Sequence, residues 1–247
     1  MYEDLADDFD QAVPFYASFG RAMVNAIDPR SDSALLDLAA GRGAVSRPAL
    51  ERGCSVTAVD AAPSMVAHLR RDLPEVRAHV MDVHELAFGD ASFDVVTAGF
   101  ALDLLDSPIT VLREAHRVLR AGGLVAFTLP GGSHDSGDLS FCNRLYAKYS
   151  GYLPAFEQPL VHTLDAASDL RSAGFTEVSV EEITVEVKIP DSESAWAFLT
   201  KNGTGELILS LPPAQRDEFR KKVDDAFARL DRTAVLKRTV RLWSGRR

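Results

Sequence analysis

The sequence predicts an α/β fold, a doubly wound and mostly parallel sheet with helices on both of its faces. Short apolar segments alternate with helical segments between residues 34 and 130, which is the pattern of strands joined by helical crossovers. Right-handed crossovers then give the doubly wound topology. The chain of 247 residues is long enough for one such domain and does not require two.

Five strands and three helices make up the predicted core, residues 34–130. Glycine and proline mark their ends: Gly53 ends the first helix, Pro63 begins the second, and Ala121-Gly122-Gly123 breaks the third. The predicted strands are Ala34–Leu38, Ser55–Asp60, Val76–Met81, Phe93–Ala98 and Leu124–Leu129, and the predicted helices are Ala44–Arg52, Pro63–Asp72 and Pro108–Leu119.

The segments outside this core are expected to belong to the same single domain, which spans residues 1–247. Residues 1–33 are predicted to form lid helices, and residues 131–162 and 190–231 are predicted to form cap segments over one end of the sheet. The predicted helices are Tyr2–Asp10, Pro14–Ile27, Leu139–Tyr152, Leu164–Ala173, Ser192–Thr200 and Pro213–Leu230, and the predicted strands are Phe175–Ile189 and Ala234–Trp243.

Composition and charge disfavour several classes of protein. The formal net charge is −9, whereas a protein that binds duplex nucleic acid usually carries a basic surface. Cys54 and Cys142 are the only cysteines, which suggests neither a disulfide scaffold nor a zinc site. Residues 1–10 are acidic, unlike a secretory signal, and no apolar run approaches the ~20 residues of a membrane span. We therefore expect a cytoplasmic protein that binds neither nucleic acid nor membrane.

The turn after the first predicted strand has the sequence Asp37-Leu38-Ala39-Ala40-Gly41-Arg42-Gly43. In an open parallel sheet, ligands bind beyond the carboxyl ends of the strands, where this turn lies. The two glycines let the backbone approach a ligand, although a glycine turn alone is also explained by tight packing. Asp60 ends the second strand, where a carboxylate can accept hydrogen bonds from both ribose hydroxyls, and Asp82 follows the third strand, where an adenine would lie.

As an ordered set, these motifs resemble the class I S-adenosylmethionine-dependent methyltransferases, and more closely their ubiquinone-biosynthesis-like (methyltransferase type 11) branch. The resemblance covers about residues 34–130 and implies a Rossmann-like sheet of about seven strands whose last strand is antiparallel, with helical cap insertions. It also implies S-adenosylmethionine as the cofactor. Beyond the glycine turn, the matching motifs are Ala58-Val59-Asp60, Met81-Asp82-Val83, Phe93-Asp94-Val95-Val96 and Arg117-Val118-Leu119-Arg120-Ala121-Gly122-Gly123.

The resemblance further implies which residues bind the cofactor. Two positions depart from the family pattern: Ala39 stands where many members have glycine, and Asp103 stands where many relatives have His or Asn. By position, Asp37, Ala39, Gly41 and Gly43 would bind the methionine part and the ribose side, Asp60 and Ala61 the ribose, Asp82 and Val83 the adenine, and Ala98 and Gly99 the methionine moiety.

The expected reaction is methyl transfer to a small molecule by in-line displacement at a sulfonium. Alignment of the reacting atoms is then the main task of the enzyme, and a base is needed only for some acceptors. The candidates for a base or orienting group are His134, His162, Asp103 and Tyr146, each of which is more simply explained as a loop, capping or packing residue. A set of aromatic residues suits either the core or the wall of a pocket for an aromatic or polyketide-like acceptor: Phe15, Tyr16, Phe100, Phe141, Tyr146 and Tyr149.

Other functions stay open at the level of sequence. A nicotinamide-dependent enzyme is disfavoured, because Ser46 stands at the third-glycine position of that motif and Asp37 would repel a diphosphate. The chain could instead bind S-adenosylmethionine without transferring its methyl group, as a cyclase or decarboxylase, or act as a regulatory binding protein, because fold alone does not settle function. A homodimer is compatible with the helical caps.

A metal site and a nucleic-acid acceptor are both disfavoured. Successive strand side chains point to opposite faces of a sheet, so the potential ligands around the third strand cannot all converge. The segment after the fourth strand is Ala98-Gly99-Phe100-Ala101 rather than the Asn-Pro-Pro-Tyr type that methylates amino groups of bases. The potential ligands are His79, Asp82, His84 and Glu85.

Overall fold

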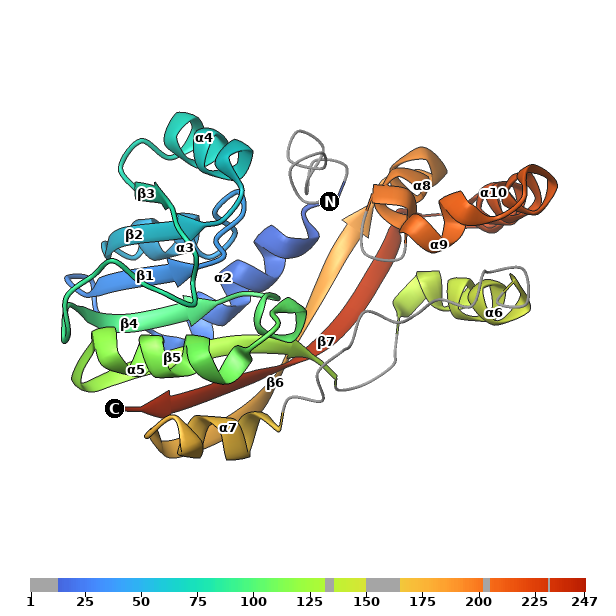
Figure 1. Ribbon diagram of the computed structural model, residues 1–247. Helices are drawn as coiled ribbons and strands as arrows, with labels where there is room; N and C mark the ends of the chain where they lie inside the picture. Colours follow the sequence, from blue (N-terminus) through green and yellow to red (C-terminus); the bar gives the residue numbers. More distant parts are fainter. Residues whose placement is uncertain (1–12, 132–135, 150–164, 202–204, 231) are drawn as a thin grey trace.

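The structure, a computed structural model, describes residues 13–131, 136–149, 165–201, 205–230 and 232–247. Within these residues, seven strands form one sheet in the order β3-β2-β1-β4-β5-β7-β6 (Figure 1). The first five strands pair in parallel, and β7 runs antiparallel to both of its neighbours, as the resemblance implied. The strands are β1 (Ala34–Leu38), β2 (Ser55–Asp60), β3 (Arg77–Val80), β4 (Phe93–Ala98), β5 (Leu119–Pro130), β6 (Thr176–Ile189) and β7 (Ala234–Arg246).

Helices cover both faces of the parallel part of the sheet. Successive strand side chains point to opposite faces, so in β1 Leu35 joins the apolar cluster under α2, α3 and α4, whereas Leu36 and Leu38 join the cluster under α5 and α7. Burial on both faces explains why these strands read as nearly continuous apolar runs. The helices are α2 (Phe15–Ile27), α3 (Ser46–Glu51), α4 (Pro63–Asp72), α5 (Pro108–Val118) and α7 (Ala166–Ser172).

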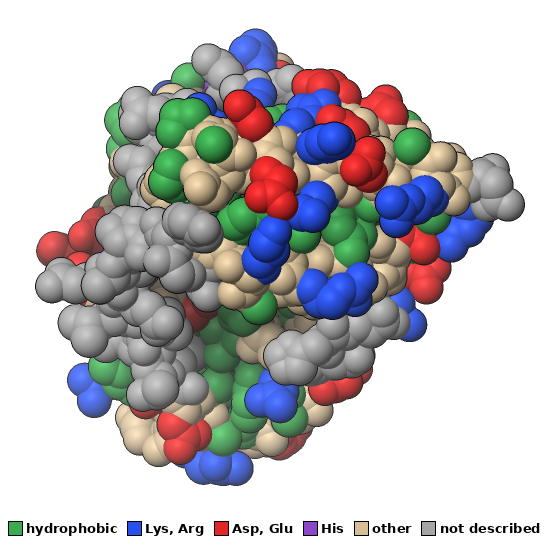
Figure 2. Space-filling model, turned by 90° about the vertical axis from the view of Figure 1, so that its right-hand side faces the viewer, with side chains coloured by type: hydrophobic (Ala, Val, Ile, Leu, Met, Phe, Trp, Pro, Cys, Tyr) green, Lys and Arg blue, Asp and Glu red, His purple; other side chains and the backbone are tan. Residues whose placement is uncertain are grey.

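The two C-terminal strands carry a separate group of helices, which we call the cap. β7 pairs with β5 only from Val240 to Arg246, so residues 234–239 and the β6 residues opposite them extend beyond the sheet. The cap helices pack around this extension, away from α3 and α4 (Figure 1). Seen from this end, basic and acidic side chains intermingle over part of the surface, and hydrophobic side chains line a hollow (Figure 2). The cap consists of α6 (Ser140–Tyr149), α8 (Ser192–Lys201), α9 (Gly205–Ser210) and α10 (Pro213–Phe227).

The structure differs from the sequence-based expectation most clearly at β5 and α9. β5 begins at Leu119 rather than at residue 124, because Leu119 pairs with Phe93 and the backbone groups of Gly122 and Gly123 exchange hydrogen bonds with Arg247. The six-residue helix α9 was not predicted at all. The predicted helix over residues 2–10 and the end of the predicted helix over 139–152 lie outside the described residues. Within the part that the structure describes, no helix combines the length and apolarity that crossing a membrane requires.

Candidate functional site

A cavity of about 920 Å³ opens at the carboxyl ends of the parallel strands. Its wall is formed by α2, by α3 and by the segments that follow β1, β2, β3 and β4. Of the remaining predicted cofactor residues, Asp37 lines a smaller adjoining recess, and Ala98 is buried in the core on the α5 side of the sheet. The predicted cofactor residues that line the cavity are Ala39, Gly41, Gly43, Asp60, Ala61, Asp82, Val83 and Gly99.

The two glycines of the turn after β1 are required for different reasons. Both have positive φ, +53° at Gly41 and +84° at Gly43, a conformation that L-residues with a side chain rarely adopt. A Cβ at Gly41 would meet no atom within 4 Å, because this residue faces the cavity. A Cβ at Gly43 would lie 2.7 Å from Leu73 and 2.8 Å from Leu69, both of which pack from the α4 side. Ala39 also has positive φ, +49°, which costs roughly 1–2 kcal/mol for a residue with a Cβ.

The carboxylate of Asp60 lies across the turn after β1 and is oriented by backbone groups. One oxygen accepts a hydrogen bond from the N–H of Gly41 at 2.8 Å, and the other accepts one from the N–H of Ala62 at 2.9 Å. A carboxylate has about four lone-pair directions, so each oxygen keeps capacity for one further donor. Asp60 can therefore accept hydrogen bonds from two neighbouring hydroxyl groups in the cavity.

Asp82 and His84 form a pair on the wall that follows β3. One oxygen of Asp82 accepts hydrogen bonds from the backbone N–H of His84 at 2.9 Å and from its Nδ1 at 2.7 Å. These bonds lower the pKa of Asp82, and its second oxygen takes no part in them. Val83 between them is buried and lines the cavity, which gives this wall an apolar surface beside a carboxylate. Within the described ranges, no group of three or more His, Cys, Asp or Glu side chains could hold a metal ion.

Asp37 is a buried carboxyl beneath the glycine turn. The Ser46 hydroxyl donates a hydrogen bond to it at 2.7 Å, and the Thr97 hydroxyl donates another at 3.0 Å from the neighbouring strand, where the register places Thr97 opposite Asp37. Burial raises the pKa of Asp37 to about 6, and the two hydroxyl groups oppose that rise. At neutral pH this carboxyl is mostly ionised and suits a positively charged ligand group.

Asp103 lies beside the cavity without lining it. It belongs to the short 3-10 helix η1 (Leu102–Leu104), and its neighbours Ala101 and Leu104 do line the cavity. One oxygen of Asp103 is buried with no hydrogen-bond partner in the described part of the chain, and burial raises the pKa of this carboxyl.

Tyr146, another predicted catalytic residue, does not line the cavity. Tyr146 lies on α6 in the cap, where its ring centroid is 5.6 Å from that of Phe219. Tyr149 packs against the same Phe219 ring. His134 and His162 lie outside the described residues and stay predictions.

The cavity wall also contains two aromatic residues that the sequence singled out and two arginines that it did not. Tyr16 and Phe100, whose rings meet at 5.5 Å, belong to the predicted aromatic set and line the cavity. Arg21 and Arg47 also line it, and Arg21 is held by two hydrogen bonds to Glu51. The arginines were not predicted, because their place depends on how α2 docks beside α3 rather than on any local pattern.

Comparison with known proteins agrees with this geometry. A family model described as a methyltransferase domain matches residues 36–127. Nocamycin O-methyltransferase from Saccharothrix syringae is 31% identical over 227 residues, which cover 82% of this chain and 81% of that protein. Aklanonic acid methyltransferase from a Streptomyces species is 32% identical over 127 residues, which cover 48% of this chain and 57% of that protein.

Solved structures share the fold. The phosphoethanolamine N-methyltransferase 2 of Haemonchus contortus, determined with S-adenosylhomocysteine, superposes with a TM-score of 0.54 at 18% identity and covers 93% of this chain and 52% of that one. A candidate type II methyltransferase from Anaeromyxobacter dehalogenans superposes with a TM-score of 0.65 at 21% identity, and the match covers 86% of this chain and 89% of that one. The open space at Gly41 and the free acceptor capacity of Asp60 fit S-adenosylmethionine, which is the cofactor. The chain belongs to the class I S-adenosylmethionine-dependent methyltransferases.

Proposed function

We propose that this methyltransferase acts on a small, largely apolar acceptor of the aromatic or polyketide-like type. The observation that carries the proposal is the apolar wall of the cavity beyond the predicted cofactor residues. Leu104 on this wall keeps 58% of its surface exposed, although it is a large apolar side chain. An exposed apolar surface at the edge of a concave site is typical of ligand binding. The apolar and aromatic residues of this wall include Pro14, Tyr16, Phe100, Leu104 and Leu105.

We also propose how the cofactor lies in the cavity. Asp60 accepts hydrogen bonds from the ribose hydroxyls, and Val83 and the free oxygen of Asp82 meet the adenine. The ionised carboxyl of Asp37, with Gly99 above the same recess, lies on the side of the amino group of the methionine moiety. The support is that these groups line the cavity and the recess that adjoins it, and that they offer the matching acceptors and charge.

The residues of the site act mainly by orientation and by exclusion of water. S-adenosylmethionine supplies an electrophilic methyl group on a positively charged sulfur. The aromatic pair of Tyr16 and Phe100 stands between α2 and the end of β4 and shields that region from solvent. The backbone of Phe100 is in a strained conformation with φ +55°, and its N–H donates a hydrogen bond to the Thr128 hydroxyl at 3.0 Å, which holds this residue in place. A dry, apolar surface next to the methyl group favours a reaction in which charge is neutralised.

Names of relatives support the acceptor class. Nocamycin O-methyltransferase and aklanonic acid methyltransferase are named for small organic acceptors, and the first of them aligns over most of this chain. We therefore place the acceptor of this protein among such small secondary metabolites rather than among macromolecules.

The test is product analysis with a panel of aromatic and polyketide-like acceptors. Incubation with S-adenosylmethionine should give S-adenosylhomocysteine and a methylated product in equal amounts. Leu104→Asp should raise KM for the acceptor, whereas the matched control Leu209→Asp, an exposed leucine (52%) on α9, should leave KM unchanged. Conversion of an acceptor without S-adenosylhomocysteine would favour a cyclase or decarboxylase instead.

A further inference from the structure

The segment between β3 and β4 needs support from outside itself. Residues 82–92 contain no helix or strand, yet the segment begins with Asp82 and Val83 on the cavity wall. Its own backbone supplies little order: Glu85 donates to the carbonyl of Asp82 at 3.3 Å. At its far end, two backbone N–H groups of the segment donate to carbonyl groups at the end of α5, those of residues 117 and 118.

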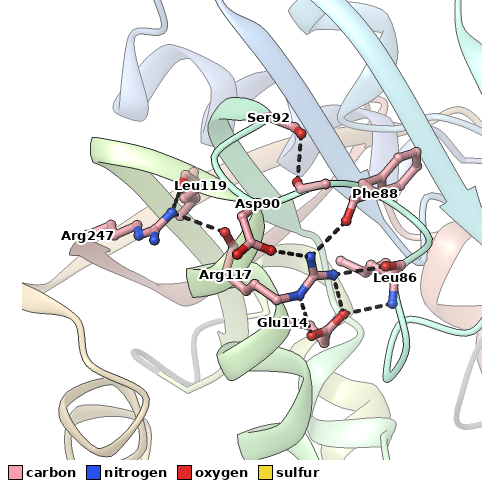
Figure 3. Close-up of polar contacts among 9 residues, drawn as sticks. Leu86, Phe88, Asp90, Ser92, Glu114, Arg117, Leu119 and Arg247 are labelled. Carbon is pink, nitrogen blue, oxygen red and sulfur yellow. Dashed lines mark hydrogen bonds and ion pairs between the residues drawn. The ribbon is translucent and has the colours of Figure 1, made fainter.

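Arg117, in the last turn of α5, clamps the middle of this segment (Figure 3). Its Nη2 donates to the carbonyl of Leu86 at 2.9 Å, and its Nη1 donates to the carbonyl of Phe88 at 2.8 Å and to the carboxylate of Asp90 at 2.9 Å. Its Nε and Nη2 donate to the two oxygens of Glu114, each at 2.8 Å. Five contacts match the five N–H groups of a guanidinium, which are fixed in one plane.

Glu114 closes the clamp from the same helix. The oxygen that accepts from Nη2 of Arg117 also accepts the backbone N–H of Leu86 at 2.8 Å. The side chain of Glu114 is only 20% exposed and that of Arg117 32% exposed, so solvent screens this pair less than a surface ion pair. Hydrogen bonds from Arg117 lower the pKa of Glu114, and the same contacts raise the pKa of Arg117. Both groups stay charged across the physiological range.

The clamp fixes the position of the segment along α5, which apolar packing alone leaves free. Val83 and Leu86 are buried in the same cluster as Val111 and Ala115 of α5. Such contacts are non-directional, and they would tolerate a small slide of the segment along the helix. The hydrogen bonds from Arg117 to the carbonyl groups of Leu86 and Phe88 do not tolerate such a slide, because their strength falls steeply with misalignment.

We propose that Arg117 is a positioning residue for the adenine of the cofactor, because its clamp sets the location of Asp82 and Val83. Arg117 does not line the cavity, so it acts through the segment and not by contact with the ligand. The inference rests on the proposed placement of adenine beside Asp82. It predicts that a weakened clamp impairs recognition of the adenine more than it impairs binding of the rest of the cofactor.

The experiment compares Arg117→Lys with the matched control Arg120→Lys. Lysine keeps the charge but cannot reproduce the planar set of donors. Arg120 follows α5 at the start of β5 and also forms an ion pair, with Asp94 at 2.7 Å, outside the clamped segment. Calorimetry measures Kd for S-adenosylhomocysteine and for S-inosylhomocysteine, in which a carbonyl oxygen replaces the 6-amino group. The wild-type protein should prefer the first, because a carboxylate repels an oxygen acceptor.

We expect Arg117→Lys to weaken the binding of S-adenosylhomocysteine by about tenfold and the binding of S-inosylhomocysteine much less. The preference for the ligand with the 6-amino group should therefore shrink. Arg120→Lys should change neither value by more than about twofold. Equal losses for both ligands, or no loss in a folded variant, would overturn the inference and leave Arg117 a purely stabilising residue.

A second variant keeps the test decisive if Arg117→Lys does not fold. Glu114→Gln retains the shape of the side chain but replaces one of the two acceptor oxygens by an NH2 group. Either the N–H of Leu86 or Arg117 then loses its acceptor, so the variant should also reduce the preference for S-adenosylhomocysteine over S-inosylhomocysteine. Failure of the wild-type protein to bind S-adenosylhomocysteine would instead overturn the cofactor placement itself.

Discussion

Among single residues, the buried carboxyl of Asp37 makes the sharpest prediction about pH. Its folded pKa of about 6 lies above the ordinary value, so the folded protein binds this proton more tightly than the unfolded chain does. The stabilising contribution is complete below about pH 4 and is lost as the pH rises through about 6, a change of up to about 3 kcal/mol.

Asp37→Asn removes this group from the titration. In urea unfolding at pH 4 to 7, the variant's free energy of unfolding minus that of the wild type should increase across this window and then level off. Other carboxyl groups cancel in the difference. A difference that does not change with pH would show that Asp37 titrates at its ordinary value.

The glycine turn allows binding and stability to be separated with two substitutions. Gly41→Ala adds a methyl group to the open cavity, so it should weaken the binding of S-adenosylhomocysteine by tenfold or more. Backbone strain in this variant should lower the free energy of unfolding by about 1 kcal/mol. Gly43→Ala drives a methyl group into Leu69 and Leu73 and should lower the free energy of unfolding further. Thermal unfolding and calorimetry measure both quantities. A Gly41→Ala protein that binds the cofactor normally would move the ligand away from this turn.

At the same scale, the sequence predicted the residues of the turn better than their partners. Spacing alone was enough to bring Gly41 and Asp60 together, because consecutive parallel strands end at one edge of the sheet. The bond from Thr97 to Asp37 was not predicted, because it depends on a strand register between residues far apart in the chain. The direction of a side chain such as Asp103, beside the cavity but not on its wall, also depends on packing that no local pattern encodes.

At the scale of elements, the docking of α2 depends on one glycine. A Cβ at Gly20 would lie 2.0 Å from the carbonyl oxygen of Ala44 in the glycine turn, a contact with backbone that no rotamer change relieves. Gly20→Ala should therefore displace α2, lower the free energy of unfolding by about 1–3 kcal/mol and weaken cofactor binding.

The matched control for α2 is Gly89→Ala. A Cβ at Gly89 would meet only the Ser92 hydroxyl, at an ordinary 3.6 Å. Chemical unfolding and calorimetry on both variants test the docking. Equal behaviour of the two proteins would mean that α2 is not packed against the turn as the structure has it.

The observed bounds of helices and strands agree best with the predicted ones where the apolar runs are short and have glycine, proline or aspartate at their ends. β1, β2, β4 and α4 have the predicted bounds, because glycine, proline and aspartate flank buried runs there. The early start of β5 depends on backbone hydrogen bonds with Arg247, which is more than 100 residues away in the sequence. α9 has only six residues, too few for a periodic pattern to show.

At the scale of the whole molecule, the cap helices lie outside the cofactor cavity, although they share one apolar cluster with α2 and with Phe100 of the cavity wall. Phe219 of α10 is fully buried between Tyr146, Tyr149 and Trp196. No residue of the described cap helices lines the large cavity. Phe219→Ala should cost about 3–5 kcal/mol of stability and leave the Kd for S-adenosylhomocysteine within about twofold.

Urea unfolding and calorimetry on Phe219→Ala, with Leu209→Ala as the exposed control on the neighbouring helix, test this separation. Cofactor affinity that falls together with stability in Phe219→Ala would show that the cap and the site form one cooperative unit.

The doubly wound, mostly parallel sheet and its antiparallel last strand were confirmed. The alternation of strands and helices predicts the parallel part, because right-handed crossovers allow few topologies. The antiparallel strand was implied by the family resemblance alone. The placement of the cap was less accessible to prediction. It depends on the paired extension of β6 and β7 beyond the sheet, which is a property of their common register and not of either strand alone.

The most direct test of the site is calorimetric titration of the wild-type protein and Asp60→Ala with S-adenosylmethionine, S-adenosylhomocysteine and NAD. We expect micromolar binding of the first two ligands to the wild-type protein, no comparable binding of NAD, and loss of binding in Asp60→Ala, because the variant removes both acceptors of the ribose hydroxyls. Binding that survives in Asp60→Ala, or tighter binding of NAD, would contradict the placement of the cofactor at the turn after β1.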